Sequence, residues 1–243
     1  MADGTGPTVA AVIVTRDPNL THLAWTLSRL ADQDYPIEEA IIVDSSEDAI
    51  EVEVEGVPTR IVQMAPEGIS AARRRGVRES TADIVIQMDE DAVFLRDDYV
   101  RRAVEHLADP TVSAVGGVVV PIRGNVNGDI IAGLDRINPS ALGTHTLVHE
   151  RAYCLDEGGD VCFPMADRGE DVSLRERLQQ FGTIRRMADQ AVLKDLPTNR
   201  QSLAQQVVVG TIVGSLTGAL TGIVRDRLEE TGGTVISRLT ASP

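Results

Sequence analysis

Three consecutive acidic residues interrupt an apolar run in the stretch DIVIQMDEDAVF at 83–94. If the preceding strand continues through them, Asp89 and Asp91 share one face and Glu90 points away. Two carboxylates about 5 Å apart repel each other by roughly 3 kcal/mol at an effective dielectric constant of about 20. A divalent cation removes this repulsion and can also hold a pyrophosphate. The acids are therefore a candidate metal and phosphate site, and a solvated acidic turn is the alternative.

Apolar runs and helical periodicities place these acids within an alternating pattern of strands and helices. Buried strands are predicted at 8–14, 38–44, 59–64, 83–88 and 112–120, and helices at 20–30, 68–80, 97–109 and 169–182, the last closed by Gly182. This order is typical of an α/β domain with a mostly parallel sheet. Residues 121–165 are rich in Gly, Pro, Asn and polar residues, and they predict a long functional loop.

The order of the elements also predicts which side chains meet. Ligands of open α/β sheets bind beyond the carboxyl ends of the strands. Asp44 ends the second predicted strand, and Asp89 and Asp91 end the fourth, so three carboxylates are expected at one edge of the sheet. Asp44 has a structural alternative, because Asp is a good helix N-cap. His145 and His149 fall in the predicted loop, where we expect a surface role.

The composition narrows the class of protein. The chain has 243 residues, 42% of them hydrophobic, and a formal net charge of −14, with Lys194 as the only lysine among 23 basic residues. This length predicts one large globular domain, and the acidic balance argues against nucleic acid as a partner. A dispersed acidic surface favours a halophilic, archaeal origin, with an ordinary soluble acidic protein as the alternative. Residues 1–8 do not resemble a signal peptide, so we expect a cytoplasmic protein with Cys154 and Cys162 reduced.

The segment VVVGTIVGSLTGALTGIV at 207–224 has no charge, and a glycine recurs in it every four residues. On a helix these glycines form a smooth stripe that allows close helix packing, and the length is near the minimum for spanning a bilayer. We therefore expect an apolar C-terminal helix that either contacts the cytoplasmic face of a membrane or packs on protein, including a second copy. The predicted division is a catalytic domain at 1–200 and this appendage at 201–243.

Four stretches, in order and at matching spacing, resemble the family 2 glycosyltransferases. They are VAAVIVTRDPN, LSRLADQDYPIEEAIIVDSSED, EGISAARRRGVRESTADIVIQMDEDAVF and GEDVSLRERLQQFG, and the likeness extends over about 9–193. The resemblance implies the GT-A fold, a Rossmann-like nucleotide-sugar-binding sheet flanked by helices. It also implies a divalent cation, Mg²⁺ or Mn²⁺, as cofactor.

The resemblance assigns roles on the donor side residue by residue. Thr15 lies in the turn after the opening strand, and Asp44 matches the acid that contacts the nucleoside. Arg73 matches the arginine of the Ala-Arg-Asn helix, near the nucleotide. Asp89 and Asp91 match the Asp-x-Asp motif, the first near the ribose and the second on the metal, so both are candidate metal ligands.

On the acceptor side, the resemblance assigns the catalytic base to Asp171, with Glu170 beside it. An inverting transfer needs one carboxylate to take the proton of the acceptor hydroxyl as that hydroxyl attacks the anomeric carbon. It also needs positive charge for the leaving diphosphate. Asp171 has a structural alternative as a helix-terminal acid, which the helix dipole favours.

Three departures from the family pattern affect these expectations. Arg74 replaces the asparagine of Ala-Arg-Asn, and Lys194 stands where many members have a histidine that helps to bind metal or diphosphate. A protonated lysine cannot ligate a cation, but it can pair with phosphate, so Lys194 is a candidate nucleotide-sugar-binding residue. The stretch QQFGTIRRM at 179–187 lacks the Gln-x-x-Arg-Trp motif of processive synthases, which favours transfer of one sugar.

The sequence therefore predicts an inverting, metal-dependent hexosyltransferase-like enzyme that moves one sugar from a UDP- or GDP-sugar to a glycan or lipid-linked acceptor. A nucleotidyltransferase is one alternative, although the turn TRDPNLTH lacks the glycine-rich loop that such an enzyme needs. A non-catalytic scaffold is the other, motivated by Lys194 at the histidine position.

Overall fold

The computed structural model describes residues 6–52, 54–121, 146–159, 161, 163 and 170–194. His145, Cys162 and the predicted apolar helix at 207–224 lie outside these residues, as does the whole proposed appendage at 201–243. Within the described ranges, none of the helices combines the length and apolar character needed to cross a membrane. Cys154 is fully buried.

The strands are β1 (Val9–Thr15), β2 (Glu39–Asp44), β3 (Thr59–Gln63), β4 (Ile84–Asp89), β5 (Val93–Phe94), β6 (Val112–Pro121), β7 (Thr146–Glu150) and β8 (Thr183–Lys194). The helices are α1 (Leu20–Ala31), α2 (Ile69–Glu79), α3 (Tyr99–Leu107), the 3₁₀ turn η1 (Arg151–Cys154) and α5 (Glu170–Leu178). All nine elements predicted from periodicity are present. The last helix ends at Leu178, so the prediction that Gly182 closes it is wrong; Gly182 leads into β8, where a Cβ would collide with the backbone of Thr111.

The described strands form one eight-stranded sheet in the order β3-β2-β1-β4-β7-β6-β8-β5. The half built from β3, β2, β1 and β4 is parallel, as predicted. Beyond β4 the sheet is mixed, because β7 is antiparallel to both β4 and β6, and β5 is antiparallel to β8. The prediction of a mostly parallel sheet therefore holds for the N-terminal half only.

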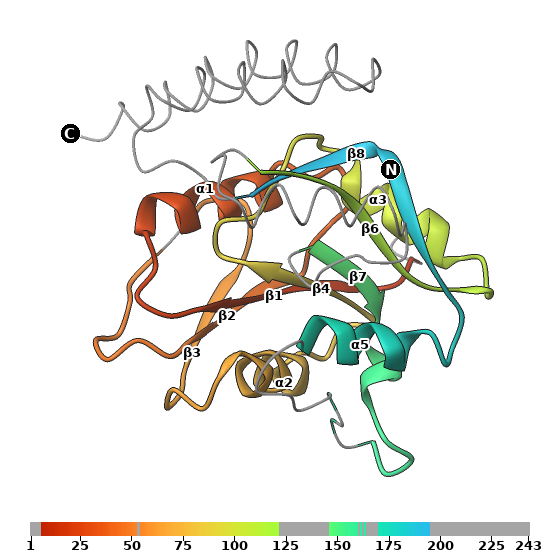
Figure 1. Cartoon of the computed structure of the whole chain (residues 1–243). Coiled ribbons are helices and arrows are strands. Elements are labelled where there is room, and N and C mark those ends of the chain that lie inside the picture. The colour runs from red at the N-terminus through yellow and green to blue at the C-terminus, as the bar shows by residue number, and fades with distance from the viewer. Residues whose placement is uncertain are drawn as a thin grey trace.

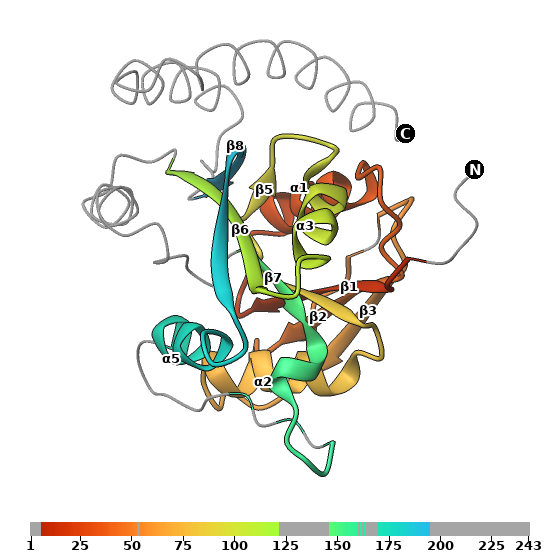
Figure 2. The ribbon, with the colours of Figure 1, turned by 90° about the vertical axis from the view of Figure 1, so that its right-hand side faces the viewer.

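Alternating residues of β1 supply two separate cores, one on each face of the sheet. Val9, Ala11 and Ile13 pack with α1 and α3, whereas Val12 contributes to the core that contains Leu174 of α5. Figures 1 and 2 show the same division, with α1 and α3 on one face of the sheet and α2 and α5 on the other. Strand side chains alternate between faces, so β1 must be apolar throughout to be covered on both sides.

The loop predicted at 121–165 contains a central strand, β7, that the sequence analysis missed. Its short apolar core is interrupted by polar residues, so composition favoured a loop. His149 lies in β7 opposite Val85 and Ala114 and is fully buried, which corrects the predicted surface role. Burial lowers the pKa of His149 to about 4, although the backbone carbonyl of Glu150 beside Nδ1 opposes this shift.

The buried His149 should make the stability of the fold depend on pH. The unfolded chain binds a proton at His149 below its ordinary pKa of 6.5, and the folded chain does so only near pH 4. The contribution of His149 to the free energy of unfolding is therefore full above pH 6.5. It is lost as the pH falls toward 4, and the total loss is about 3 kcal/mol. In urea unfolding between pH 4 and 7, His149→Leu should show a weaker pH dependence than the wild type. Equal slopes for the two proteins would contradict the buried neutral imidazole.

The close approach of α2 to the sheet depends on Gly76. A Cβ at this position would overlap Cγ1 of Val12, which is buried on β1. A glycine inside a helix usually costs about 1 kcal/mol relative to alanine. Its presence here is explained by the contact that it permits between helix and strand.

Gly76→Ala should therefore destabilise the protein, opposite to the usual effect of this change in a helix. We expect a loss of roughly 1–3 kcal/mol, as for an overpacked core. A double-mutant cycle with Val12→Ala checks the cause, because the smaller partner makes room for the new methyl group. If Gly76→Ala costs the same in both backgrounds, contact with Val12 is not the reason for the glycine.

Candidate functional site

A cavity of about 400 Å³ lies at the carboxyl edge of the parallel strands. It is lined by Val14, Thr15, Arg16, Ser45, Pro66, Gly68, Ile69, Ala72, Asp89, Glu90, Asp91 and Lys194. Four of the predicted site residues therefore share one cavity: Thr15, Asp89, Asp91 and Lys194. The remaining four, Asp44, Arg73, Glu170 and Asp171, do not line it.

The topology explains why Lys194 meets the acids although 105 residues separate it from Asp89. Two successive antiparallel pairings, β4 with β7 and β7 with β6, leave β6 parallel to β4, and β8 is parallel to β6. The carboxyl end of β8 thus lies at the same edge as that of β4. In addition, Leu193 pairs with Val93, two residues after Asp91, which brings the end of β8 alongside the acidic turn.

At this edge two carboxylates and two cations alternate. The Lys194 ammonium donates to Asp89 Oδ2 and to Asp91 Oδ1, at 2.6 Å in each case. Asp89 Oδ1 accepts a third bond, also of 2.6 Å, from Nη2 of Arg73. Burial alone would lower the pKa of Lys194, but Asp89 and Asp91 outweigh this effect and raise the pKa above its ordinary value. Lys194 is therefore a permanent cation here.

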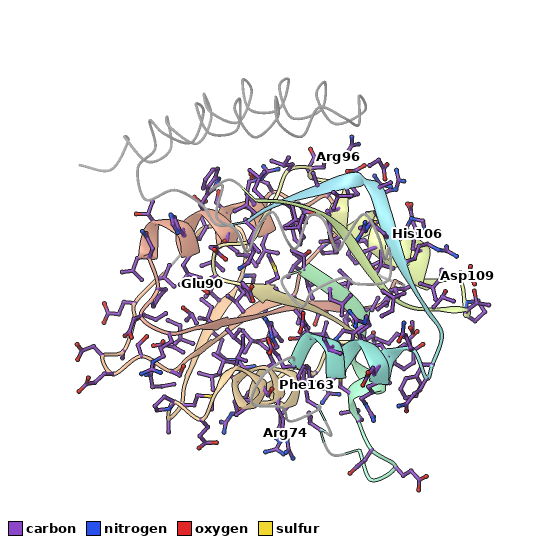
Figure 3. All side chains as sticks on the ribbon, viewed as in Figure 1. Arg74, Glu90, Arg96, His106, Asp109 and Phe163 are labelled. Carbon is purple, nitrogen blue, oxygen red and sulfur yellow. The ribbon has the colours of Figure 1, made fainter. Side chains whose placement is uncertain are left out.

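Arg73 contacts a cavity residue, Asp89, without lining the cavity itself. Its side chain is only 1% exposed, so it lies beneath the cavity and contacts Asp89 there. Its Nη1 also donates to the carbonyl of Met88, at 3.4 Å. The next residue, Arg74, projects from the side of α2 away from the sheet (Figure 3) and is not part of the cavity lining. The replacement of asparagine by Arg74 therefore leaves the described cavity unchanged.

Helix α1 supports the acidic turn from the opposite face of the sheet. Thr26 Oγ1 donates to the carbonyl of Glu90 at 2.8 Å, and the buried Arg29 donates to the carbonyls of Phe94 and Leu95. Glu90 itself lies just beyond the end of β4 (Figure 3). Burial, followed by the charges of Asp91 and Asp89, raises the pKa of Glu90 to about 6. A solvated acidic turn does not describe this arrangement.

Asp44 lies at the end of β2 and is fully buried. Oδ1 accepts from the backbone N–H and the hydroxyl of Ser46, whereas Oδ2 is buried without a hydrogen-bond partner. No helix begins at this point, so the alternative of a helix N-cap is wrong. Thr15 Oγ1, at the neighbouring end of β1, is also buried and unpartnered. Buried polar atoms are normally satisfied, so these two atoms are candidates for a ligand hydrogen bond.

Glu170 and Asp171 form the first turn of α5, which is held to the sheet by the buried Leu174 and Leu178. Both acids are partly exposed, and Asp171 Oδ1 accepts the N–H of Val172 at 2.9 Å. An acid in the first turn suits the helix dipole, so the structural alternative for Asp171 stands beside the catalytic one. Helix α5 lies on the same face of the sheet as α2 (Figures 1 and 2).

Gly68 and Arg16 are two of the lining residues that the sequence analysis did not assign to the site. Gly68 precedes α2 with φ 99° and ψ 165°, a conformation that is essentially restricted to glycine, and no side chain caps this helix end. Its signal was a glycine at the first position of the helix predicted at 68–80. Arg16, in the turn after β1, is 66% exposed at the mouth of the cavity and brings a second basic side chain to it. Arginine in a predicted turn has no distinctive sequence signal.

The acids do not fit a divalent cation as they stand. Both oxygens of Asp89 and one of Asp91 bind Arg73 or Lys194, and the ammonium lies between the two carboxylates where a cation would bridge them. Among the described residues, no group of three or more His, Cys, Asp or Glu side chains is arranged to hold a metal. The metal dependence implied by the resemblance therefore stays a prediction.

Comparison with known proteins gives a family and a fold. A family model described as Glycosyl transferase family 2 matches residues 12–148, more than half of the chain. The structure of the mannosyltransferase PcManGT from Pyrobaculum calidifontis, in complex with GDP-Man and Mn²⁺, is similar with a TM-score of 0.59 at 20% identity, over 99% of this chain and 77% of that chain. No curated protein sequence matches the chain.

A second similar structure is S. aureus TarS 1–349 in complex with UDP-GlcNAc. Its TM-score is 0.58 at 14% identity, and the match covers 84% of this chain and 66% of that chain. At identities this low, the likeness to both structures shows a shared fold and does not extend to substrates.

The buried ion pair between Arg73 and Asp89 should contribute far more to stability than an exposed pair on the same helix. Arg73→Met removes the buried one of the two cations that bind Asp89 and leaves Lys194, so it should cost about 2 kcal/mol, as for a lost hydrogen bond to a charged group. Arg75→Met is the matched control, because Arg75 is 47% exposed and pairs with Glu79 at 2.7 Å. It should cost less than about 1 kcal/mol in the same urea titration. Similar losses in the two variants would show that Arg73 does not hold Asp89 in place.

Proposed function

Because the chain belongs to glycosyl transferase family 2 and its mixed α/β fold matches that of GT-A glycosyltransferases, we propose that it transfers one sugar from a nucleotide-sugar to a glycan or lipid-linked acceptor, with inversion at the anomeric carbon. One observation carries this proposal. A single cavity at the carboxyl edge of the sheet gathers Thr15, Asp89, Asp91 and Lys194, with the unpartnered oxygen of Asp44 nearby.

The donor occupies this cavity in the proposed reaction. Asp44 Oδ2 and Thr15 Oγ1 are buried acceptors at the ends of adjacent strands, suited to N–H or O–H groups of a nucleoside. Lys194 and Arg16 supply positive charge for the diphosphate. The similar structures were solved with GDP-Man and with UDP-GlcNAc, so a GDP- or UDP-hexose is the proposed donor class.

The acceptor side is proposed to depend on α5. The acceptor hydroxyl attacks the anomeric carbon from the side opposite the diphosphate, and its proton passes to the Asp171 carboxylate as the carbon–diphosphate bond breaks. Leu174 and Leu178 fix α5 against the sheet, so the helix presents Glu170 and Asp171 from a rigid element. Glu170 is proposed to lie beside the base without accepting the proton.

Two further expectations belong to this proposal. The stretch 179–187 lacks the processive motif and here connects α5 to β8, which supports transfer of a single sugar. Contact with a membrane through 207–224, which lipid-linked acceptors would favour, remains a prediction about residues outside the described ranges. Because Lys194 already bridges the two carboxylates, the proposed steps do not depend on a bound metal.

Asp171→Asn should lower transfer by roughly a hundredfold or more, because the amide cannot accept the acceptor proton. The affinity for nucleoside diphosphate should stay nearly constant, since Asp171 does not line the donor cavity. The assay measures release of nucleoside diphosphate from a panel of UDP- and GDP-sugars, with acceptor present, and calorimetry measures nucleotide binding.

Glu170→Gln is the matched control, because it makes the same loss of charge one residue earlier in the helix turn. It should retain most of the activity. If both variants lose activity equally, or if Asp171→Asn loses nucleotide affinity in step with rate, Asp171 is not the base. Failure of every donor to react or bind would refute the proposed transfer itself.

A further inference from the structure

We propose that the Lys194 ammonium takes the place of the divalent cation, so that this chain holds the donor diphosphate with its own lysine and binds it without metal. This inference rests on the proposed function, because it concerns how the same cavity holds the donor. It follows from the contacts of Lys194, from the strand pairing that positions it and from the charge balance of the site.

The contacts leave little opportunity for a metal ion. A divalent cation binds carboxylate oxygens at about 2.0–2.6 Å, and one that bridged the acidic pair would need oxygens of both Asp89 and Asp91. The Lys194 nitrogen lies 2.6 Å from one oxygen of each, and Arg73 binds the other oxygen of Asp89. A metal that bridged these carboxylates would first have to displace the ammonium. Because the displaced ammonium carries one positive charge, the exchange would add only one net positive charge to the site. A divalent metal that bound two carboxylates without a lysine between them would add two.

Strand pairing holds the lysine in this position. Lys194 is the last residue of β8 and pairs with Pro121 of β6, and the preceding residue, Leu193, pairs with Val93 of β5. Its side chain is only 20% exposed, comparable to the 20% and 19% of the two aspartates. Since β5 follows the acidic turn directly, the same pairing fixes the turn and the lysine relative to each other.

The charges of the cluster balance without any added ion. The two carboxylates of Asp89 and Asp91 carry two negative charges, and Arg73 and Lys194 carry two positive ones. Arg73 is buried beneath the cavity, whereas Lys194 lines it. An ammonium has three N–H donors, and the aspartates take two, so the third can bind a phosphate oxygen.

The start of α2, which also lines the cavity, suits an anion as well. Gly68, Ile69 and Ala72 line the cavity from the first turn of α2, and no side chain caps this helix end. The positive end of a helix favours phosphate. A diphosphate between Lys194 and the start of α2 is therefore neutralised by groups of this chain.

The first experiment measures metal binding without nucleotide, by the electron paramagnetic resonance signal of free Mn²⁺ titrated with the full chain. The wild type should leave the Mn²⁺ signal unchanged. Lys194→Met, which keeps the aliphatic stem and removes the charge, should bind Mn²⁺ because it frees two carboxylates. Lys194→His should also bind Mn²⁺, and this variant replaces Lys194→Met in the titration if Lys194→Met does not fold. Mn²⁺ binding by the wild type as tight as that of these variants would overturn the proposal.

The second experiment measures binding of GDP and UDP by calorimetry, in EDTA and in Mn²⁺. The wild type should bind one of them in EDTA, and Lys194→Met should lose roughly ten- to hundredfold in affinity there, as for a lost charged hydrogen bond. Mn²⁺ should restore binding to Lys194→Met and Lys194→His. Lys194→Arg should retain binding in EDTA. Wild-type binding that requires Mn²⁺ would refute the role of the lysine.

Arg101→Met is the matched control for loss of a paired cation. Arg101 donates to Asp34 at 2.9 Å and to Glu105 at 2.8 Å, and none of these residues lines the cavity. It should change neither Mn²⁺ nor nucleotide binding, and an equal loss in this variant would assign the effect to overall charge. Absence of nucleotide binding under every condition would refute the proposed function and the phosphate contact of Lys194. The Mn²⁺ titration would still decide whether the ammonium excludes the metal.

Discussion

Two carboxylates at the end of one strand repel each other, and the described structure relieves this repulsion with cations from two other elements. Lys194 arrives on β8 and Arg73 on α2, and both bind Asp89. Each element is in turn held by packing: β8 pairs with β5 and β6, and α2 approaches β1 through Gly76. The acidic turn therefore couples both halves of the sheet and one of its helix layers. Removal of either cation would affect the fold and the cavity together.

The two faces of the sheet contribute differently to the site. On one face, α1 supports the backbone of the acidic turn through Thr26 and Arg29 without reaching the cavity with these groups. On the other face, α2 supplies the buried arginine and an uncapped helix end, and α5 carries the acids proposed for catalysis. The helix that supports the acidic turn and the helices that carry the proposed functional groups thus lie on opposite faces of the sheet. The cavity lies at the edge where the parallel strands end.

The proposed replacement of a metal by Lys194 would make donor binding independent of the supply of that metal. A metal is exchangeable and depends on its supply, whereas Lys194 is part of the strand that completes the sheet. Positive charge aimed at a leaving diphosphate acts by the same electrostatic principle from either source. One similar structure contains Mn²⁺ with GDP-Man, and the fold that the two proteins share does not itself require the ion to be retained here.

Local pattern in the sequence was sufficient for the helices and for the parallel half of the sheet, because these elements have apolar faces with a clear period. It also placed Asp44, Asp89 and Asp91 at strand ends, since an apolar run that stops at an acid marks such an end. The missed strand β7 has no such clear apolar pattern. Its five residues include Thr146, His149 and Glu150, and only its position between β4 and β6 makes it a buried strand.

The partners of the site residues were decided by the tertiary structure. Arg73 was assigned to the donor side by resemblance, and the close packing of α2 against β1 buries it in contact with Asp89. Lys194 was recognised as a departure from a family pattern, but its bridge to Asp89 and Asp91 depends on two antiparallel pairings and the short strand β5. Sequence by itself determined which chemical groups end the strands. Which charges meet was determined by strand order, because contacts between residues 105 positions apart are set by the packing of the whole sheet and leave no local periodicity in the chain.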